Sequence, residues 1–370
     1  MSSAPRTLLL TPGPLTTSAR TRAALDRDWG SRNADFIALS EGVRARLATL
    51  AGLAGTHAAV PIQGSGTFAV EAAVQTLVPR DGQLLVLVNG SYGRRIVEMA
   101  RRLSRGVVVL EVPENQAISS DAVARALAAD RAITDVVLVH CETTTGLLNP
   151  LAEIAACVRD ARRRLLVDAI SSFGAVPIDG AEIPCTALIG SANKGLEGVP
   201  GLGFVIAEIA HLNTCEGNAV SLSLDLFAQW RGFETTGQWR FTPPVQVVAA
   251  LAAALDQLEQ EGGVAARHAR YSRNRDVLVR GMRAHGFETY IATDLQAPVI
   301  VTFRIPPGGW FRFAAFYDFL HARGVVIYPG KLTDEPSFRI GCIGAIGPQD
   351  MARAMEAVDA FMAVSREPAR

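Results

Sequence analysis

Short apolar runs alternate with Ala-rich amphipathic stretches between about residues 47 and 205. Such alternation indicates an α/β fold. Because the runs contain almost no polar positions, they are typical of strands in a sheet that helices cover on both faces. We predict strands at residues 84–88, 107–112, 135–140, 165–168, 186–189 and 203–207, and helices at residues 67–78, 92–103, 121–129 and 151–163.

The pattern changes after Pro243 and Pro244. The chain continues with longer amphipathic stretches and two further apolar runs. This pattern is typical of a smaller α/β domain joined by long helices. We therefore expect a large domain of residues 16–262 and a small domain of residues 1–15 with 263–370. In the second half we predict helices at residues 245–261, 264–286, 311–323 and 348–364, and strands at residues 299–304 and 337–340.

Composition narrows the classes of function. Of the 370 residues 49% are hydrophobic, and 36 basic residues balance 36 acidic ones, so the formal net charge is zero. This balance predicts a soluble protein and argues against nucleic-acid or acidic-membrane surfaces, which need clustered Lys and Arg. The N-terminal apolar run is too short for a signal peptide, so we expect a cytoplasmic location. The five cysteines are scattered without a C-x-x-C pair, which favours reduced thiols over a disulfide or a zinc site.

A single lysine, Lys194, stands among small and apolar residues in "LIGSANKGLEGVPGLGFV". Removing an amine from water lowers its pKa and makes it a usable nucleophile. Amines of this kind form Schiff bases with carbonyl compounds, including the aldehyde of pyridoxal phosphate (PLP). The alternative is a lysine that reaches solvent from a strand end, so other residues must decide between the two.

A phosphate cradle is the first further requirement of PLP. The segment "IQGSGTFAVEAAVQ" places Ser65, Gly66 and Thr67 at the start of a predicted helix. Free N–H groups and the helix dipole favour a phosphate dianion there. The alternative is an ordinary loop with a helix N-cap. The segment matches neither the P-loop nor the G-x-G-x-x-G fingerprint.

Polar side chains also follow neighbouring strand predictions. Asp168 ends the apolar run "RLLVD", Tyr92 follows another run in "VNGSYGRR", and Thr143 follows a third in "HCETTTG". Open α/β sheets bind ligands at the carboxyl ends of their strands, so these groups and Lys194 are predicted to meet at one edge. A helix N-cap for Asp168 and a plain boundary aromatic for Tyr92 are the alternatives.

The order of these residues resembles the fold-type I PLP enzymes of aminotransferase class V. Seven segments are similar to the 2-aminoethylphosphonate:pyruvate branch of that family, over a span from Leu8 to about Phe361. The resemblance implies a large domain with a mainly parallel seven-stranded sheet wrapped by helices, plus a smaller α/β domain. The segments are "LLLTPGPLTTS", "DWGSRNADF", "QGSGTFAVEA", "HCETTTG", "SANKGLEGVPG", "FTPP" and "FRIGCIG".

The resemblance also implies roles at the cofactor. Lys194 would form the Schiff base, Asp168 would pair with the pyridine nitrogen, and Tyr92 would stack on the ring. Thr242 in "RFTPP" resembles a residue that such enzymes lend to the cofactor phosphate of the neighbouring subunit, which implies a homodimer with the active site at its interface; taken alone, Thr242 is a turn residue. Ser65, Gly66 and Thr67 would hold the phosphate of the cofactor bound to their own chain. From its place at a strand end, we expect Thr143 within reach of the ring's phenolic oxygen.

The implied reaction transfers the amino group of 2-aminoethylphosphonate to pyruvate, without a metal. Arg339 in "SFRIG" resembles the anion-binding arginine of the family, and Arg32 in "WGSRNADF" resembles a basic residue with which phosphoserine aminotransferases hold a substrate phosphate across the dimer. Guanidinium groups suit both carboxylates and phosphonates. The alternative for both is a surface arginine.

Three rival functions share parts of this pattern. An alanine or serine:glyoxylate aminotransferase would have the same cofactor residues and differ around Arg32 and Arg339. A class V cysteine desulfurase needs a mobile nucleophilic cysteine, for which Cys215 and Cys342 are poor candidates. The PLP-binding half of a transcription regulator would carry a DNA-binding segment, and we expect none before Thr11.

Overall fold

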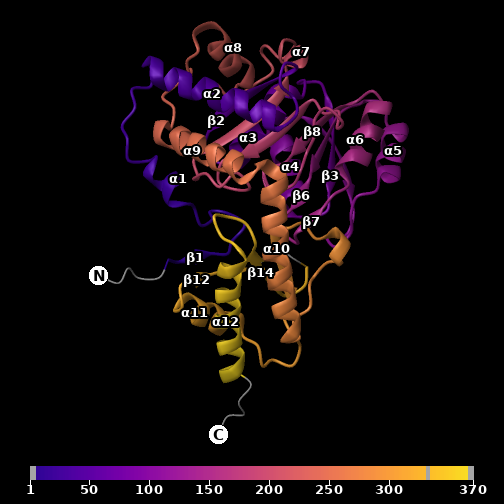
Figure 1. Ribbon diagram of the computed structural model, residues 1–370. Coiled ribbons are helices and arrows are strands. Elements are labelled where there is room, and N and C mark those ends of the chain that lie inside the picture. The colour runs from indigo at the N-terminus through magenta and orange to yellow at the C-terminus, as the bar shows by residue number, and fades with distance from the viewer. Residues whose placement is uncertain (1–5, 331–333, 366–370) are drawn as a thin grey trace.

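The computed structural model describes residues 6–330 and 334–365. A seven-stranded sheet forms the core of the larger, upper part of the molecule in Figure 1. Strand β10 is antiparallel to both of its neighbours, and the strands from β9 to β4 run parallel. This confirms the predicted α/β fold with a mainly parallel seven-stranded sheet. In spatial order the strands are β2 (His57–Gln63), β10 (Leu202–Glu208), β9 (Ala187–Ser191), β8 (Arg164–Asp168), β5 (Ile133–Val139), β3 (Gln83–Val88) and β4 (Gly106–Glu111).

Helices cover both faces of this sheet, as the apolar strands predicted. Alternate side chains of one strand enter different cores: Leu85 and Leu87 belong to one buried cluster, and Leu84 and Val86 to the other. Such alternation follows from the two-residue period of a strand. The first cluster includes side chains of α2 (Ala34–Leu50), α5 (Ser120–Ala129), α6 (Leu151–Asp160) and α9 (Val245–Glu261), and the second includes side chains of α3 (Gly66–Leu77), α4 (Ser91–Arg102) and α8 (Leu226–Thr236).

A second, smaller sheet lies in the lower part of Figure 1 and contains β11 (Ile300–Arg304), β14 (Ser337–Gly341) and β13 (Tyr328–Pro329). A separate apolar core surrounds it, and Leu8 and Leu10 from the N-terminal segment join this core. These contacts support the expected division at residues 15/16 and 262/263, which stays a prediction. The same core contains residues of α10 (Gly263–Ala284), α11 (Phe313–His321) and α12 (Pro348–Ser365), while β1 (Leu8–Leu9) pairs with β12 (Val325–Val326).

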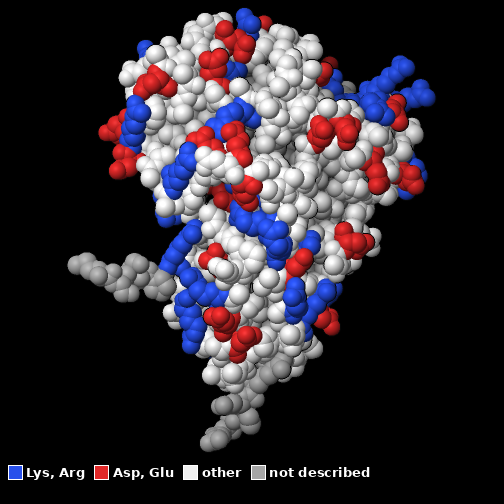
Figure 2. All heavy atoms as spheres, in the orientation of Figure 1, with Lys and Arg blue, Asp and Glu red and all other residues white. Residues whose placement is uncertain are grey.

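Helix α10 runs from the upper to the lower part of the molecule and packs against both α9 and α12 (Figure 1). Basic and acidic side chains are interspersed over the face in Figure 2, in keeping with the zero net charge. Within the described ranges, no helix combines the length and apolar character that a membrane crossing requires. All five cysteines are free thiols.

Helix α6 ends at Asp160, three residues before the predicted end. The reason is local, because Arg162 adopts a left-handed backbone with φ of 55° and cannot continue a helix.

Candidate active site

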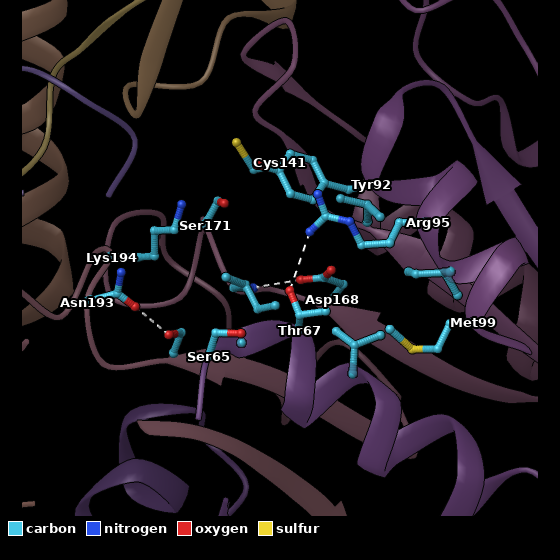
Figure 3. A pocket seen from close by; sticks show the side chains of 16 residues that line it. Ser65, Thr67, Tyr92, Arg95, Met99, Cys141, Asp168, Ser171, Asn193 and Lys194 are labelled. Atoms are coloured by element: carbon cyan, nitrogen blue, oxygen red, sulfur yellow. Dashed lines mark hydrogen bonds between the residues drawn. The ribbon is translucent and has the colours of Figure 1, made fainter. Parts of the chain in front are cut away.

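The carboxyl ends of four neighbouring strands meet at one pocket (Figure 3). Strands β9, β8, β5 and β3 are consecutive and parallel, so the residues that follow them share one edge of the sheet. Lys194 follows β9, Asp168 ends β8, and Tyr92 follows β3. All three line the pocket together with Ser65, Gly66 and Thr67. The structure therefore brings together six of the residues that the sequence proposed.

The N-terminus of α3 faces this pocket. Helix α3 begins at Gly66, and the hydroxyl of its N-cap residue, Ser65, makes no capping hydrogen bond. The first N–H groups of a helix lack acceptors within it; here the Phe68 N–H donates to the Ser65 carbonyl at 3.0 Å, which leaves those of Gly66 and Thr67 for a ligand. A Cβ atom at Gly66 would lie 2.7 Å from Ile170 Cδ1, so only glycine allows this packing. Free N–H groups, a free hydroxyl and the positive helix end fit a phosphate dianion.

Asp168 contributes a carboxylate to the lining of the same pocket, close to Thr67 (Figure 3). Its Oδ1 accepts the N–H of Ile170 at 3.0 Å. The pKa of Asp168 is raised to about 6, chiefly by burial and in part by the nearby Glu142, whereas the hydrogen bond from Ile170, Lys194 and Arg95 act in the opposite direction. A buried carboxylate of this kind fits the protonated nitrogen of a pyridine ring.

Lys194 keeps part of its surface open to the pocket, while protein atoms closely surround its amine. Burial lowers the pKa of the Lys194 amine to about 8; Cys141 and Asp168 oppose this effect, and Arg339 and Arg95 add to it. An amine with a pKa near neutral pH can act both as nucleophile and as general base.

Arg95 is a pocket residue that the sequence analysis missed. Tyr92 stands in the first turn of α4 and Arg95 one turn further on, with its guanidinium carbon 4.8 Å from the Tyr92 ring centroid. Arg95 Nη1 donates to Thr67 Oγ1 at 3.4 Å. The spacing of three residues from Tyr92 within a predicted helix is the signal that could have revealed it.

Two further neighbours of Lys194 were also missed. Asn193 lines the pocket, and its Oδ1 accepts the hydroxyl of Ser191 at 2.7 Å (Figure 3). Gly13, from the N-terminal segment, packs against the aliphatic part of Lys194. No periodic pattern links Gly13 to the strands, so the sequence carried no signal for this contact.

Arg339 reaches the edge of the site from the smaller sheet. It lies on β14, is 7% exposed, and donates through Nη1 to the Thr143 carbonyl at 3.1 Å and through Nη2 to the Pro329 carbonyl at 3.2 Å. Burial lowers the pKa of Arg339, while Tyr92 and Glu142 raise it. Within residues 6–330 and 334–365 no carboxylate forms an ion pair with Arg339, so its charge is available to an anion.

Thr143 lies beside the pocket without lining it. Its Oγ1 is buried and has no hydrogen-bond partner. Buried hydroxyls of this kind are rarely left without a partner, so this atom fits a ligand oxygen nearby.

Arg32 and Thr242 do not join the pocket of their own chain. Arg32 is exposed just before α2, and Thr242 is exposed between α8 and α9. Neither lines the pocket.

The donor set suits an organic cofactor. Among the described residues no three His, Cys, Asp or Glu side chains gather in a way that could hold a metal ion. A helix N-terminus, a buried carboxylate and an amine of lowered pKa together fit a phosphorylated aldehyde with a basic ring nitrogen. Burial raises the pKa of Cys215 to about 11 and that of Cys342 to about 12, which opposes the thiolate that a cysteine desulfurase needs.

Comparison with known proteins agrees with this chemistry. The aminotransferase class V family model matches residues 16–353. The chain is 52% identical to a 2-aminoethylphosphonate–pyruvate transaminase of Pseudomonas putida (strain W619), over 97% of both chains, and 51% identical to one of Pseudomonas aeruginosa PAO1, also over 97% of both. Pyridoxamine-pyruvate aminotransferase from Mesorhizobium loti superimposes with a TM-score of 0.90 at 26% identity, covering 100% of this chain and 95% of that one. The chain belongs to the class V aminotransferases, PLP-dependent enzymes of fold type I.

Proposed function

We propose that this enzyme transfers the amino group of 2-aminoethylphosphonate to pyruvate, giving phosphonoacetaldehyde and L-alanine. The observation that carries the proposal is the 52% identity, over nearly the whole chain, to a transaminase named for these two substrates. Arg339 supports it, because this buried guanidinium, which has no carboxylate ion-pair partner among the described residues, lies near the reactive amine although it is not a residue that lines the pocket.

Bound PLP would supply an electron sink for the carbon that bears the substrate amine. The residues of this chain have separate roles around it. In each half-reaction Lys194 Nζ would carry one proton between two carbons: from the amine-bearing substrate carbon to the aldehyde carbon of the cofactor in the first half, and in the reverse direction in the second. Asp168, ionised at neutral pH with a pKa of about 6, stabilises a positive charge on the ring nitrogen. The Tyr92 ring would hold the cofactor ring, and the start of α3 would bind its phosphate.

We assign the substrate anion to Arg339. Its planar guanidinium can pair with phosphonate in one half-reaction and with carboxylate in the other, since both present oxygens that match its donors. Arg32 is exposed on its own chain, so we assign it to the site of a neighbouring subunit.

We further propose a homodimer with the active site at its interface. Phe68 in the first turn of α3, Leu222 and Phe241 are 48%, 72% and 50% exposed. Arg240 connects Leu222 and Phe241, because it donates to the Leu222 carbonyl at 3.0 Å and lies over the Phe241 ring. Large exposed apolar side chains are typical of an interface. A second copy seated there would bring its exposed Thr242 to the cofactor phosphate.

The free thiols of all five cysteines support a reducing, cytoplasmic location.

Absorbance spectroscopy of the PLP-loaded protein tests the reaction. We expect 2-aminoethylphosphonate to bleach the visible band of the cofactor and pyruvate to restore it, with alanine reversing the second half-reaction. Serine and glyoxylate serve as the competing donor and acceptor. A protein that responds to serine or alanine but not to 2-aminoethylphosphonate would be an alanine or serine:glyoxylate aminotransferase instead.

Borohydride reduction tests the role of Lys194 separately. The chain has only two lysines, Lys194 and Lys331, so peptide mass spectrometry locates the attached cofactor without ambiguity. We expect attachment at Lys194 in the wild type and in Lys331→Ala, and none in Lys194→Ala. Attachment at Lys331 would reject the assignment.

A further inference from the structure

Glu197 holds an unusual backbone conformation three residues after Lys194. Its φ is 62°, in the left-handed region that residues other than glycine rarely adopt. Such strain persists only where surrounding contacts enforce it, and it concentrates at functional sites. The Glu197 N–H donates to the Lys194 carbonyl at 2.9 Å, which closes the turn that carries the lysine. The strained residue is therefore part of the lysine turn itself.

Helix α10 holds this turn by three side chains. Glu197 Oε1 accepts from the Tyr271 hydroxyl at 2.6 Å and from Arg270 Nη2 at 2.7 Å. Arg267 lies 3.8 Å from the same oxygen through Nε and donates through Nη1 to the Gly195 carbonyl at 3.1 Å. Glu197 is 5% exposed, and Arg267 and Tyr271 are fully buried. The helix thus binds both the backbone and the side chain of the turn.

The same α10 residues also hold the segment that follows β14. Arg270 Nη1 donates to the carbonyls of Gly344 and Ile346 at 2.7 and 2.6 Å, and the Tyr271 hydroxyl accepts the Gly344 N–H at 3.3 Å. This segment continues the strand that carries Arg339. One set of side chains therefore connects the lysine turn with the arginine strand.

The charges within this network balance. Glu261 accepts from Nε of Arg267 at 2.9 Å and from Nε of Arg270 at 2.7 Å, so two arginines face two glutamates. Because each buried charge has a partner of opposite sign, no uncompensated charge is left in the protein interior. Without the Glu197 carboxylate, Arg267 and Arg270 would lose one of their two acidic partners at the turn that carries Lys194.

We propose that Glu197 is a positioning residue that fixes the Lys194 turn against α10 and thereby sets the separation between the Lys194 amine and the Arg339 guanidinium. The inference rests on the proposed function, because Lys194 and Arg339 are the groups assigned there to proton transfer and to the substrate anion. No hydrogen bond or ion pair joins the Glu197 carboxylate to the Lys194 amine or to the Arg339 guanidinium among the described residues. A displacement of about 1 Å between reacting groups can lower a rate on the order of 100-fold.

Chemical labelling of the apoprotein provides the first test. The rate at which acetic anhydride modifies Lys194 is followed against pH by peptide mass spectrometry. In the wild type we expect a midpoint near the pKa of about 8. In Glu197→Ala and Tyr271→Phe the loosened amine regains water, so the midpoint moves up by about one pH unit toward the ordinary lysine value. Glu197→Gln keeps an acceptor for Tyr271 and should restore most of the wild-type midpoint.

Asp135→Asn is the matched control. Asp135 is also a buried carboxylate paired with an arginine, at 2.6 Å from Arg164, but it lies at the amino end of the parallel strands. We expect this variant to lose stability with an unchanged Lys194 midpoint. Tyr271→Phe keeps the buried ring, so the test survives if Glu197→Ala does not fold.

Steady-state kinetics give the second readout. With PLP saturating, we expect kcat/KM of Glu197→Ala to fall roughly 10- to 100-fold, with partial recovery in Glu197→Gln. The proposal is overturned if the labelling midpoints of Glu197→Ala and Tyr271→Phe equal that of the wild type, or if Asp135→Asn shifts by the same amount. Labelling uses no substrate, so its failure leaves the proposed reaction standing. A wild-type spectrum that ignores 2-aminoethylphosphonate rejects the reaction and leaves the lysine geometry untouched.

Discussion

Gly13 and Lys194 are in direct contact although they lie far apart in the sequence. A Cβ atom added to Gly13 would stand 2.8 Å from Lys194 Cδ and 2.9 Å from the carbonyl oxygen of Asn193. The φ of Gly13 is 121°, which side chains with a Cβ atom rarely adopt. The N-terminal segment thus forms a wall beside the lysine where only glycine fits.

Replacing Gly13 by alanine should therefore impair catalysis more than folding. We expect Gly13→Ala to displace Lys194 and to lower kcat/KM roughly 10- to 100-fold, with a loss in the free energy of unfolding of about 1 kcal/mol or slightly more. Gly55→Ala is the control, since Gly55 has φ of 87° and no atom within 4 Å of the added Cβ. Steady-state kinetics and urea unfolding of both variants distinguish the contact from simple backbone strain, which would impair both alike.

The Asp168 carboxylate should destabilise the apoprotein at neutral pH. Its pKa is raised from 3.8 to about 6, so the folded state binds more protons than the unfolded state between these values, and stability falls as pH rises through this window. The cost is fully present above pH 6 and absent below pH 3.8. We expect apo Asp168→Asn to be more stable than apo wild type at pH 7.5, on the order of 2–3 kcal/mol, and inactive.

Urea unfolding of both apoproteins at pH 7.5 and at pH 4 measures this difference. The gap between variant and wild type should shrink at the lower pH. Asp135→Asn provides a contrast, because Asp135 is paired with Arg164 and its loss should destabilise the protein. A gap for Asp168→Asn that is unaffected by pH would contradict the assigned cause.

Arg339 should control substrate affinity rather than cofactor binding. Charged hydrogen bonds contribute about 1.5–3 kcal/mol, so Arg339→Gln should lower kcat/KM for 2-aminoethylphosphonate roughly 10- to 100-fold, mainly through KM. Arg339→Lys keeps the charge without the planar fork and should recover only part of the loss. Arg304→Gln, on the neighbouring strand β11, is the control. Equal losses in both glutamine variants would assign the effect to the small sheet as a whole.

The exposed apolar side chains should govern assembly. We expect Leu222→Asp with Phe241→Asp to convert the proposed homodimer into monomers in sedimentation analysis, because both side chains would be buried at the proposed interface. PLP affinity should fall with it, since the partner's Thr242 would no longer reach the phosphate. Val364→Asp introduces a charge at an equally exposed apolar position on α12 and should change neither. Dimers that persist in the double variant would place the interface elsewhere.

The strands that carry the site were predictable because each is a continuous apolar run. The prediction for α9 matches the observed helix, and β3, β5, β8, β9 and β10 lie within two residues of their predicted bounds. Strand β2 was missed because Pro61 interrupts its pattern; as an edge strand, β2 tolerates a proline that a central strand would not. The hydrophobic pattern reflects burial along a single element, so it predicted best the strands that are most completely buried.

The unpredicted part of the site depends on contacts between distant segments. Lys194, Asp168 and Tyr92 were found because parallel strands deliver their ends to one edge. No comparable rule predicts Gly13 and Glu197. Gly13 matters because it closely approaches Lys194, and Glu197 because its partners lie on α10. Arg32 and Thr242 remain predictions, because both concern a second chain.

The amino ends of the parallel strands open onto turns at the edge remote from the pocket. Before β3, the Gly82 N–H donates to the Pro79 carbonyl at 2.9 Å, and Arg80 and Asp81 between them are exposed. The free energy of closing a flexible loop grows slowly, by about 0.6 kcal/mol for each doubling of its length. Fluorescent reporters, immobilisation tags or an entire second enzyme could be inserted at this turn. Amino-group transfer would proceed undisturbed at the opposite edge of the sheet.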